Sequence, residues 1–218
     1  MEEPSSADHL SSSLTDLMTS LMVIFILLLL VFVHRTAGKD AAVTDVLLKR
    51  LRHDLTPQGF NERSIRRDPR DRNAILVIVP DRLMNFETGK STLQPAGELF
   101  LKTYIPEFAE VLCSDEFRSS VESIVVEGHT DTQRYVGSAE ESQNKNLRLS
   151  QDRSMEVVKN ALADLAGREA ERGCFLEKLS ASGRGEQEQE ATPDESRRVI
   201  LKIRVKANDA ESIRVGVQ

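Results

Sequence analysis

The chain is poor in aromatic residues: its 218 residues include no tryptophan and two tyrosines, and aromatic residues make up 5% of the sequence. Proteins that bind single-stranded nucleic acid stack bases on aromatic side chains, and no such platform is visible here. The formal net charge of −6 points the same way, because an acidic chain repels a phosphate backbone. The composition therefore argues against nucleic acid as a partner.

The sequence also lacks the residue patterns of common catalytic and metal sites. His129 has no cysteine or histidine partner at metal-ligand spacing, and no serine, histidine and aspartate arrangement is evident. Gly183 and Gly185 in "SGRGE" fit turn positions better than a nucleotide-binding loop. We therefore expect a structural role for His129, no cofactor or metal, and a protein that is not an enzyme.

Lysine and arginine are absent from the first 20 positions, which argues against a cleaved signal peptide, because such peptides begin with a basic segment. Residues 17–33 are apolar except for Thr19 and Ser20. With the three preceding residues this run forms a helix of about 20 residues, roughly 30 Å, which matches a bilayer core. The sequence predicts a transmembrane helix over residues 14–35, preceded by a tail at residues 1–13.

A carboxylate, Asp16, lies at the leading edge of this helix. A charged side chain in hydrocarbon costs free energy and usually has a function. Aspartate is also a common N-cap, which would place Asp16 at the lipid headgroups. Thr19 and Ser20 lie about one turn further on, where each hydroxyl could bond the carboxyl group or help to coordinate sodium. The residues alone leave both interpretations of Asp16 open.

A highly charged stretch follows the apolar run. Its first half has apolar residues on one helical stripe, namely Val43, Val46, Leu47, Leu51 and Leu55. Its second half, "TPQGFNERSIRRDPRDR", combines Pro, Gly and alternating charge, which is typical of a tether. The sequence predicts a linker with a short amphipathic helix over residues 36–72. This helix either lies on its neighbour, which we favour, or acts as a regulatory plug.

The rest of the chain predicts one α/β (α+β) domain over residues 73–206, followed by a tail at residues 207–218. Apolar, β-branched runs predict strands, and 3.6-residue spacing predicts helices, with Ser150 as the cap of the second helix. The expected elements are a strand at 73–80, a helix at 93–112, a strand at 121–128, a helix at 149–167, and strands at 176–186 and 197–206. The order β-α-β-α-β-β predicts a mixed sheet with helices on one face.

Polar residues gather where the second strand ends, in "EGHTDTQ", and where the second helix opens, in "NLRLSQDRS". Arg153 can hold a carboxylate with two parallel hydrogen bonds, and Asp131 can receive an ammonium group. Together they suit a zwitterion with both groups on one carbon. The alternative is an Asp–Arg salt bridge that only ties the loop to the helix.

The motifs "GHTD", "N..LS..RS", "SGRGE" and "RRV" occur in the order found in the OmpA-like peptidoglycan-binding domain, which residues 73–206 resemble. The resemblance implies noncovalent binding of meso-diaminopimelate in the cell-wall peptide. Asp131 would hold its ammonium group and Arg153 its carboxylate, in a pocket shaped by Thr130, Asn146 and Arg197. Two departures are Ser196, where the family usually has Asn, and a longer loop at residues 132–145.

The stretch "TDLMTSLMVIF" resembles the span of MotB-type stator subunits of flagellar motors. The resemblance implies a homodimer in the bacterial inner membrane, surrounded by a multi-span MotA-like subunit in a five-to-two complex. Asp16, with Thr19 and Ser20, would carry a translocated proton or sodium ion. The amino terminus would then be cytoplasmic and the carboxyl-terminal domain periplasmic, although basic residues after the span favour the opposite orientation.

An oxidising periplasm favours a disulfide between Cys113 and Cys174, which the residues alone leave undecided. The short tether and the short, acidic amino tail are most similar to ZorB subunits of Zorya anti-phage defence systems, whose partner is a ZorA-like subunit. That resemblance implies a motor acting in antiviral defence. The alternatives are a flagellar MotB-type stator subunit and a passive OmpA-like cell-wall anchor.

Overall fold

The computed structural model describes the backbone of residues 6–56 and 60–206. The chain forms two compact units, Met1–Lys39 and Asp40–Gln218. The helices are α1 (Ser6–Leu55), η2 (Glu62–Ser64), α2 (Asp81–Met84), α3 (Pro95–Leu112), α4 (Ala139–Asp164), α5 (Glu169–Lys178) and α6 (Pro193–Ser196). The strands are β1 (Ile65–Arg67), β2 (Ala74–Pro80), β3 (Val121–His129), β4 (Leu179–Gly185) and β5 (Arg198–Val205).

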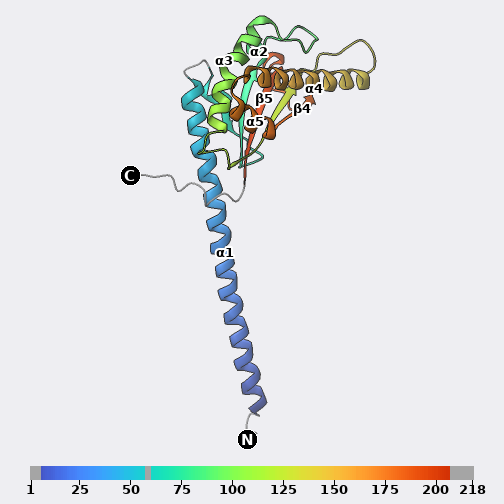
Figure 1. Ribbon diagram of the computed structural model, residues 1–218. Helices are drawn as coiled ribbons and strands as arrows, with labels where there is room; N and C mark the ends of the chain where they lie inside the picture. The colour runs from blue at the N-terminus through green and yellow to red at the C-terminus, as the bar shows by residue number, and fades with distance from the viewer. Residues whose placement is uncertain (1–5, 57–59, 207–218) are drawn as a thin grey trace. The chain divides into compact units, whose positions relative to one another are not determined.

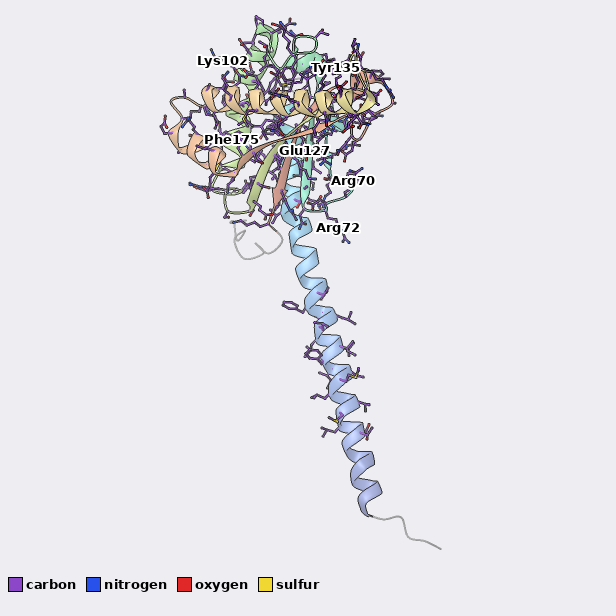
Figure 2. All side chains as sticks on the ribbon, turned by 90° about the vertical axis from the view of Figure 1, so that its right-hand side faces the viewer. Arg70, Arg72, Lys102, Glu127, Tyr135 and Phe175 are labelled. Atoms are coloured by element: carbon purple, nitrogen blue, oxygen red, sulfur yellow. A yellow bond between two sulfur atoms is a disulfide. The ribbon has the colours of Figure 1, made fainter. Side chains whose placement is uncertain are left out.

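The first unit contains one apolar helical segment, Thr15–Val33, with a mean hydropathy of 2.7. Its 19 residues extend over about 28 Å, which is long enough to cross a bilayer core. The large apolar side chains of this segment are exposed, and Figure 2 shows them projecting around the helix. In length, composition and position the segment agrees with the transmembrane helix predicted for residues 14–35.

The second unit begins with the last part of α1. The sequence predicts a separate helix inside a linker, whereas α1 continues without interruption to Leu55. Val43, Leu47 and Leu51 are buried and join the hydrophobic core of the domain, while Val46 is 43% exposed. Because this stripe is buried against the domain, it lies on its neighbour, as the favoured interpretation expects.

A short strand, β1, lies in the stretch for which the sequence predicts a tether. It pairs antiparallel with β2, with Ile65 opposite Val77 and fully buried. Just after it, Asp68 accepts hydrogen bonds from Lys202 Nζ of β5 and from the Arg70 N–H. Residues 65–68 are therefore part of the domain rather than of a linker. Because two of the three residues of β1 are charged, the pattern of apolar residues does not predict this strand.

The sheet has five strands in the order β1-β2-β5-β3-β4. Only β3 and β4 run parallel; the other neighbours are antiparallel, so the sheet is mixed, as predicted. The central strand β5 places Leu201 opposite Val77 of β2 and Val126 of β3. These three side chains are almost fully buried, which fixes the register, because a slip by one residue would turn them to the other face.

Helices cover one face of the sheet, as predicted (Figure 1). Helix α4 lies over β4 and β3, and α3 and α5 complete the layer. Two glycines permit this close approach: a Cβ on Gly128 would lie 2.2 Å from the Ser150 carbonyl oxygen, and one on Gly183 would lie 2.6 Å from the Gln151 nitrogen. Gly183 therefore serves helix packing rather than a turn, while Gly185, with φ of 57°, fits the turn expected for it.

Helix α4 begins earlier than the sequence predicts. Its N-cap is Ser138, whose side chain accepts from the Glu141 N–H while the Glu141 carboxylate accepts from the Ser138 N–H, a capping box. Ser150, predicted as the cap, is buried inside the helix, and its hydroxyl oxygen accepts the Gly185 N–H at 2.8 Å. The first three turns of α4 carry few apolar residues, so hydrophobic spacing does not detect them.

A disulfide links two helices of this layer. Cys113, at the end of α3, and Cys174, in α5, form a disulfide with their Cα atoms 6.0 Å apart. Each helix leads towards one of the parallel strands β3 and β4, which explains why the two positions meet. Helix α5 itself is absent from the sequence prediction, which begins the strand at residue 176 where the structure still has helix.

Candidate functional site

A pocket of about 410 Å³ lies where several chain segments meet at one edge of the sheet. It is lined by Asp81, Phe86, Thr88, Gly89, Thr130, Asp131, Gln133, Arg134, Tyr135, Asn146, Leu149, Arg153 and Arg197. All five pocket residues predicted from the sequence are among them: Thr130, Asp131, Asn146, Arg153 and Arg197. Tyr135 of this set is labelled in Figure 2.

The strand register explains why these segments meet. Arg198, the first residue of β5, pairs with His129 at the end of β3 and with Pro80 at the end of β2. The residues that follow β2 and β3, and the one that precedes β5, therefore lie at the same edge. These residues are Asp81, Thr130 and Arg197, and α4 supplies the side chains of Asn146 and Arg153 from the helical layer.

The carboxylate of Asp131 is held by neighbours within the domain. Its Oδ2 accepts from Arg197 Nη1 at 2.5 Å, and its Oδ1 accepts from the Gln133 N–H at 3.1 Å. Arg197 also bonds Asp194, and the hydrogen bond to Asp131 is the main reason why the pKa of Arg197 is raised. The salt bridge of Asp131 is thus made with Arg197 rather than with Arg153, so it does not tie the loop to α4 as the alternative interpretation supposed.

Arg153 is buried, with 5% of its surface exposed, and its guanidinium carbon lies 4.9 Å from the centre of the Phe86 ring. Its Nε donates to the Lys90 carbonyl at 3.0 Å. Burial lowers the pKa of Arg153, an effect opposed by the charge of Asp81. None of the ion pairs found among the described residues joins Arg153 to a carboxylate. The pocket therefore contains a fixed positive group that can receive an anion.

Asn146 and Thr130 shape the pocket around these charges. Asn146 is buried, and its side-chain amide donates to the Gln133 carbonyl at 3.3 Å and to Glu186 Oε2 at 3.4 Å. The Thr130 N–H donates to the Gly185 carbonyl at 2.8 Å. Its hydroxyl is buried and has no hydrogen-bond partner within the described part of the chain.

Sequence reasoning missed two charged lining residues, Arg134 and Asp81. Asp81 adds a second carboxylate to the pocket. It opens α2 directly after β2, and its side chain is 26% exposed. Burial is the main cause that raises the pKa of Asp81, aided by the charges of Asp131 and Asp194 and opposed by Arg153 and Arg197. In the sequence, Asp81 could have been recognised only by its position directly after a strand, since the segments that follow β3 and precede β5 also reach this pocket. Phe86, between α2 and α3, also lines the pocket.

His129 precedes the lining residue Thr130, and its side chain is fully buried. Its Nδ1 is 3.2 Å from the Gln187 carbonyl, and its Nε2 is 3.9 Å from Glu127, which Figure 2 labels on β3. In the stretches that the structure describes, no group of three His, Cys, Asp or Glu residues is placed to hold a metal ion. These surroundings fit a structural role for His129.

The second candidate site lies on α1, in the other unit. Asp16 stands well inside the helix, which begins at Ser6, so it is not the N-cap. Asp16, Thr19 and Ser20 are all exposed on the helix surface. The Thr19 hydroxyl donates to backbone carbonyls, that of Thr15 at 2.8 Å and that of Asp16 at 2.9 Å. Asp16 is thus the second residue of the apolar segment, and its side chain is exposed on the surface of the helix.

Comparison with known proteins shows a matching family and similar solved structures. A model of the OmpA family matches residues 85–200. A MotB-like protein from Desulfovibrio vulgaris is similar in structure, with a TM-score of 0.57 and 21% identity over 78% of this chain and 99% of that one. The periplasmic domain of Helicobacter pylori MotB (residues 90–256) has a TM-score of 0.50 and 17% identity over 66% of this chain and 80% of that one. No curated protein sequence matches the chain.

Proposed function

Because the chain belongs to the OmpA family, we propose that its pocket binds peptidoglycan and that the chain is the wall-anchored subunit of an ion-driven stator in the bacterial inner membrane. The observation that carries the binding proposal is the pocket itself. It brings all five sequence-predicted residues together around a buried arginine, Arg153, that no carboxylate neutralises by direct contact within the described residues.

The ligand chemistry follows from the charges of the pocket. An arginine with part of its guanidinium edge turned to a cavity suits a carboxylate, and nearby carboxylates suit an ammonium group. The free end of meso-diaminopimelate carries both groups on one carbon. A pocket of about 410 Å³ is large enough for this end and the start of its aliphatic chain. The binding is noncovalent, in keeping with a family whose members are typically not enzymes.

The apolar segment Thr15–Val33 supports a single-pass anchor, and the MotB relatives support a periplasmic place for the domain. The Cys113–Cys174 disulfide favours the same compartment, because disulfides persist in oxidising surroundings. The basic residues Arg35 and Lys39 after the span favour the opposite orientation. We give more weight to the domain, because peptidoglycan lies in the periplasm.

The stator proposal adds a task for Asp16. A carboxylate inside an apolar segment can take up and release a proton or a sodium ion as its access changes, with Thr19 and Ser20 beside it. Moving one elementary charge across 100 mV releases about 2.3 kcal/mol. A second copy of this chain and a multi-span MotA-like subunit would surround the helix and turn this energy into movement.

The structural relatives are MotB-like, so a MotB-type stator role has more support than a role in anti-phage defence. The defence proposal, a ZorB-type subunit, depends on the short amino tail and tether alone. Deleting the gene separates the two roles: loss of swimming supports a flagellar stator, and loss of phage resistance supports defence.

One substitution tests the motor against a passive wall anchor. Asp16→Asn should abolish the activity of the complex, while membrane abundance and peptidoglycan binding stay at wild-type levels. Asp45→Asn is the matched control, because Asp45 lies on the same helix but outside the apolar segment, paired with Arg67. A fully active Asp16→Asn complex would leave only the anchor.

A further inference from the structure

Another pocket of the domain, of about 360 Å³, lies on the face of the sheet opposite the layer of α3, α4 and α5. Along β5, the core residues Val199, Leu201 and Ile203 point towards that layer, so the residues between them point to the opposite face. Two of these, Ile200 and Lys202, line this pocket, and Figure 2 labels its lining residues Arg70 and Glu127. It shares no lining residue with the pocket around Arg153.

Cationic side chains outnumber carboxylates in this pocket. The cationic lining residues are Arg66, Arg70, Arg184, Arg198 and Lys202. The lining carboxylates are Asp68, Glu127, Glu188 and Glu190. Lys202 is paired with Asp68, whereas Arg70 and Arg184 share the carboxylate of Glu188. The pocket therefore has an excess of positive charge, which favours an anion as its ligand.

Arg198, the first residue of β5, is the most buried of these cations, with its side chain 4% exposed. Its Nη1 and Nη2 donate to the carbonyls of Ser196 and Glu188, at 3.2 and 2.8 Å. Its contact with Glu190, at 3.6 Å, is longer than a hydrogen bond. Its Nε is buried and has no hydrogen-bond partner within the described part of the chain. Because an unbonded buried donor costs free energy, an acceptor from outside the chain would be stabilising here.

Arg184 brings a second such donor to this pocket. Its Nε is also buried, with no hydrogen-bond partner among the residues that the structure describes, while its Nη2 donates to Glu188 Oε1 at 3.3 Å. Arg184 lies near the end of β4 and Arg198 at the start of β5, so the two come from opposite sides of β3. Glu188 connects them, because its carboxylate accepts from Arg184 and its carbonyl from Arg198. Two guanidinium groups are thus held at one pocket, each with an unused donor.

We propose that this pocket binds a phosphate-type oxyanion between Arg184 and Arg198, with the exposed Arg66 as a further donor. Guanidinium groups bond phosphate oxygens strongly, because both partners are charged. The donors come from three strands, β1, β4 and β5, and the four oxygens of a phosphate can serve them better than the two oxygens of a carboxylate. This site is separate from the proposed wall binding, and neither proposal depends on the other.

The test adds inorganic phosphate to the full chain in detergent, with sodium chloride at equal ionic strength as the reference. Nitrogen NMR detects the Nε–H signals of the arginines directly. We expect the signals of Arg184 and Arg198 to shift with phosphate until they saturate, and to stay in place with chloride. Signals that do not shift or do not saturate would overturn the inference, because water alone would then meet these donors.

Two variants show whether the effect is specific to the pocket. Arg184→Gln removes one donor and its charge, so the affinity for phosphate should fall about tenfold or more. Arg204→Gln is the matched control, because Arg204 lies on β5 with its side chain 53% exposed and does not line the pocket. It removes the same charge, and the affinity should fall by less than about twofold. Equal losses in the two variants would overturn the inference, since net charge alone would explain them.

Glycerol 3-phosphate distinguishes two sources of the anion. An affinity equal to or above that of inorganic phosphate would indicate a phosphate monoester, such as that of a phosphorylated lipid. A lower affinity would indicate free phosphate. Both results support the site, provided that Arg184→Gln weakens the same ligand, and a loss of neither ligand in that variant would contradict it.

Discussion

The apolar segment of α1 and the pocket of the domain both contain aspartates, but these aspartates differ in whether charged side chains of the protein lie beside them. In the domain, Asp131 is paired with Arg197, and Asp81 faces Arg153 and Arg197 from nearby. In the apolar segment, none of the ion pairs within the described side chains includes Asp16. The two pocket aspartates are therefore ion-paired within the domain, whereas Asp16 makes no ion pair with the side chains that the structure describes.

The same contrast holds for apolar surface. The domain buries its apolar side chains in one core, to which the last turns of α1 contribute. The side chains of Thr15–Val33 are exposed and need lipid or other helices around them. We therefore expect changes in the domain to alter its own stability and binding, and changes in the apolar segment to leave both unchanged.

The largest expected effect on stability comes from the disulfide. Replacing Cys113 and Cys174 together by serine should lower the free energy of unfolding of the domain by about 4 kcal/mol, because the bond closes a long loop in the unfolded chain. The sequence separation of the two cysteines is 61 residues. Urea denaturation followed by circular dichroism of the domain measures the difference.

Insertion into membranes should be the same in this double variant, which serves as its control. An unchanged urea midpoint would show that the bond contributes nothing to the folded domain.

The next effect uses two leucines of the same helix. Leu47→Ala should lower the free energy of unfolding of the domain by about 2–5 kcal/mol, because Leu47 is fully buried in the core and its loss leaves a cavity. Leu27→Ala, at a position that is 56% exposed, should leave it unchanged. Equal midpoints for the two variants in thermal unfolding would contradict the assignment of these two parts of α1 to different units.

These two leucines also show what the sequence could predict. The apolar stripe of residues 43–55 is visible in the sequence, but nothing in it shows that the helix continues from the span, because Arg35 and Lys39 suggest an end to the apolar run. Ser138 has its capping partner Glu141 in a polar stretch that looks like a loop. Arg66 and Arg67 hide β1, a three-residue strand whose only strong apolar residue is Ile65.

The pocket was more predictable than its surroundings. "GHTD" and "N..LS..RS" supply Asp131, Asn146 and Arg153 as motifs, and the structure brings them together. Asp81 carries no motif, and its place in the pocket follows only from the antiparallel pairing of β2 with β5, which sequence order does not reveal. For the same reason the sequence does not show that Asp131 pairs with Arg197, the residue before β5.

A pH titration sharpens the contrast between Asp81 and the rest of the pocket. Burial raises the pKa of Asp81 above its usual value, so this carboxylate takes up a proton at a higher pH than an exposed aspartate does. The charged groups facing it are Arg153 from α4, Arg197 before β5, Asp131 after β3 and Asp194 from α6. Affinity for diaminopimelate should fall by up to about tenfold per pH unit below the pKa of Asp81.

Asp81→Asn supplies the control, because the amide does not take up a proton in this pH range. Parallel profiles for the variant and the wild type would show that the charge of Asp81 does not act on the ligand.

The smallest effect concerns the bridge between Asp68 and Lys202. Burial raises the pKa of Asp68, but the hydrogen bonds from Lys202 and from the Arg70 N–H outweigh it, so the net pKa is lowered. The stabilisation is thus present above the pKa of an unfolded aspartate and is lost as the pH falls through the lower folded value. Asp68→Asn should cost about 1 kcal/mol at neutral pH, because the lysine is 27% exposed.

In acid, the variant and the wild type should converge in thermal unfolding experiments. A constant difference between them down to the lowest pH would show that the charge of Asp68 is not the cause.

The most direct test of the central claim, that this pocket holds the cell-wall peptide through Arg153, is the binding of the full chain to isolated peptidoglycan. Co-sedimentation should be retained by the wild type and by Arg148→Ala, since Arg148 lies on the same helix with its side chain 86% exposed and outside the pocket. Arg153→Ala should bind at least about tenfold more weakly. Equal binding by Arg153→Ala and the wild type would contradict the account.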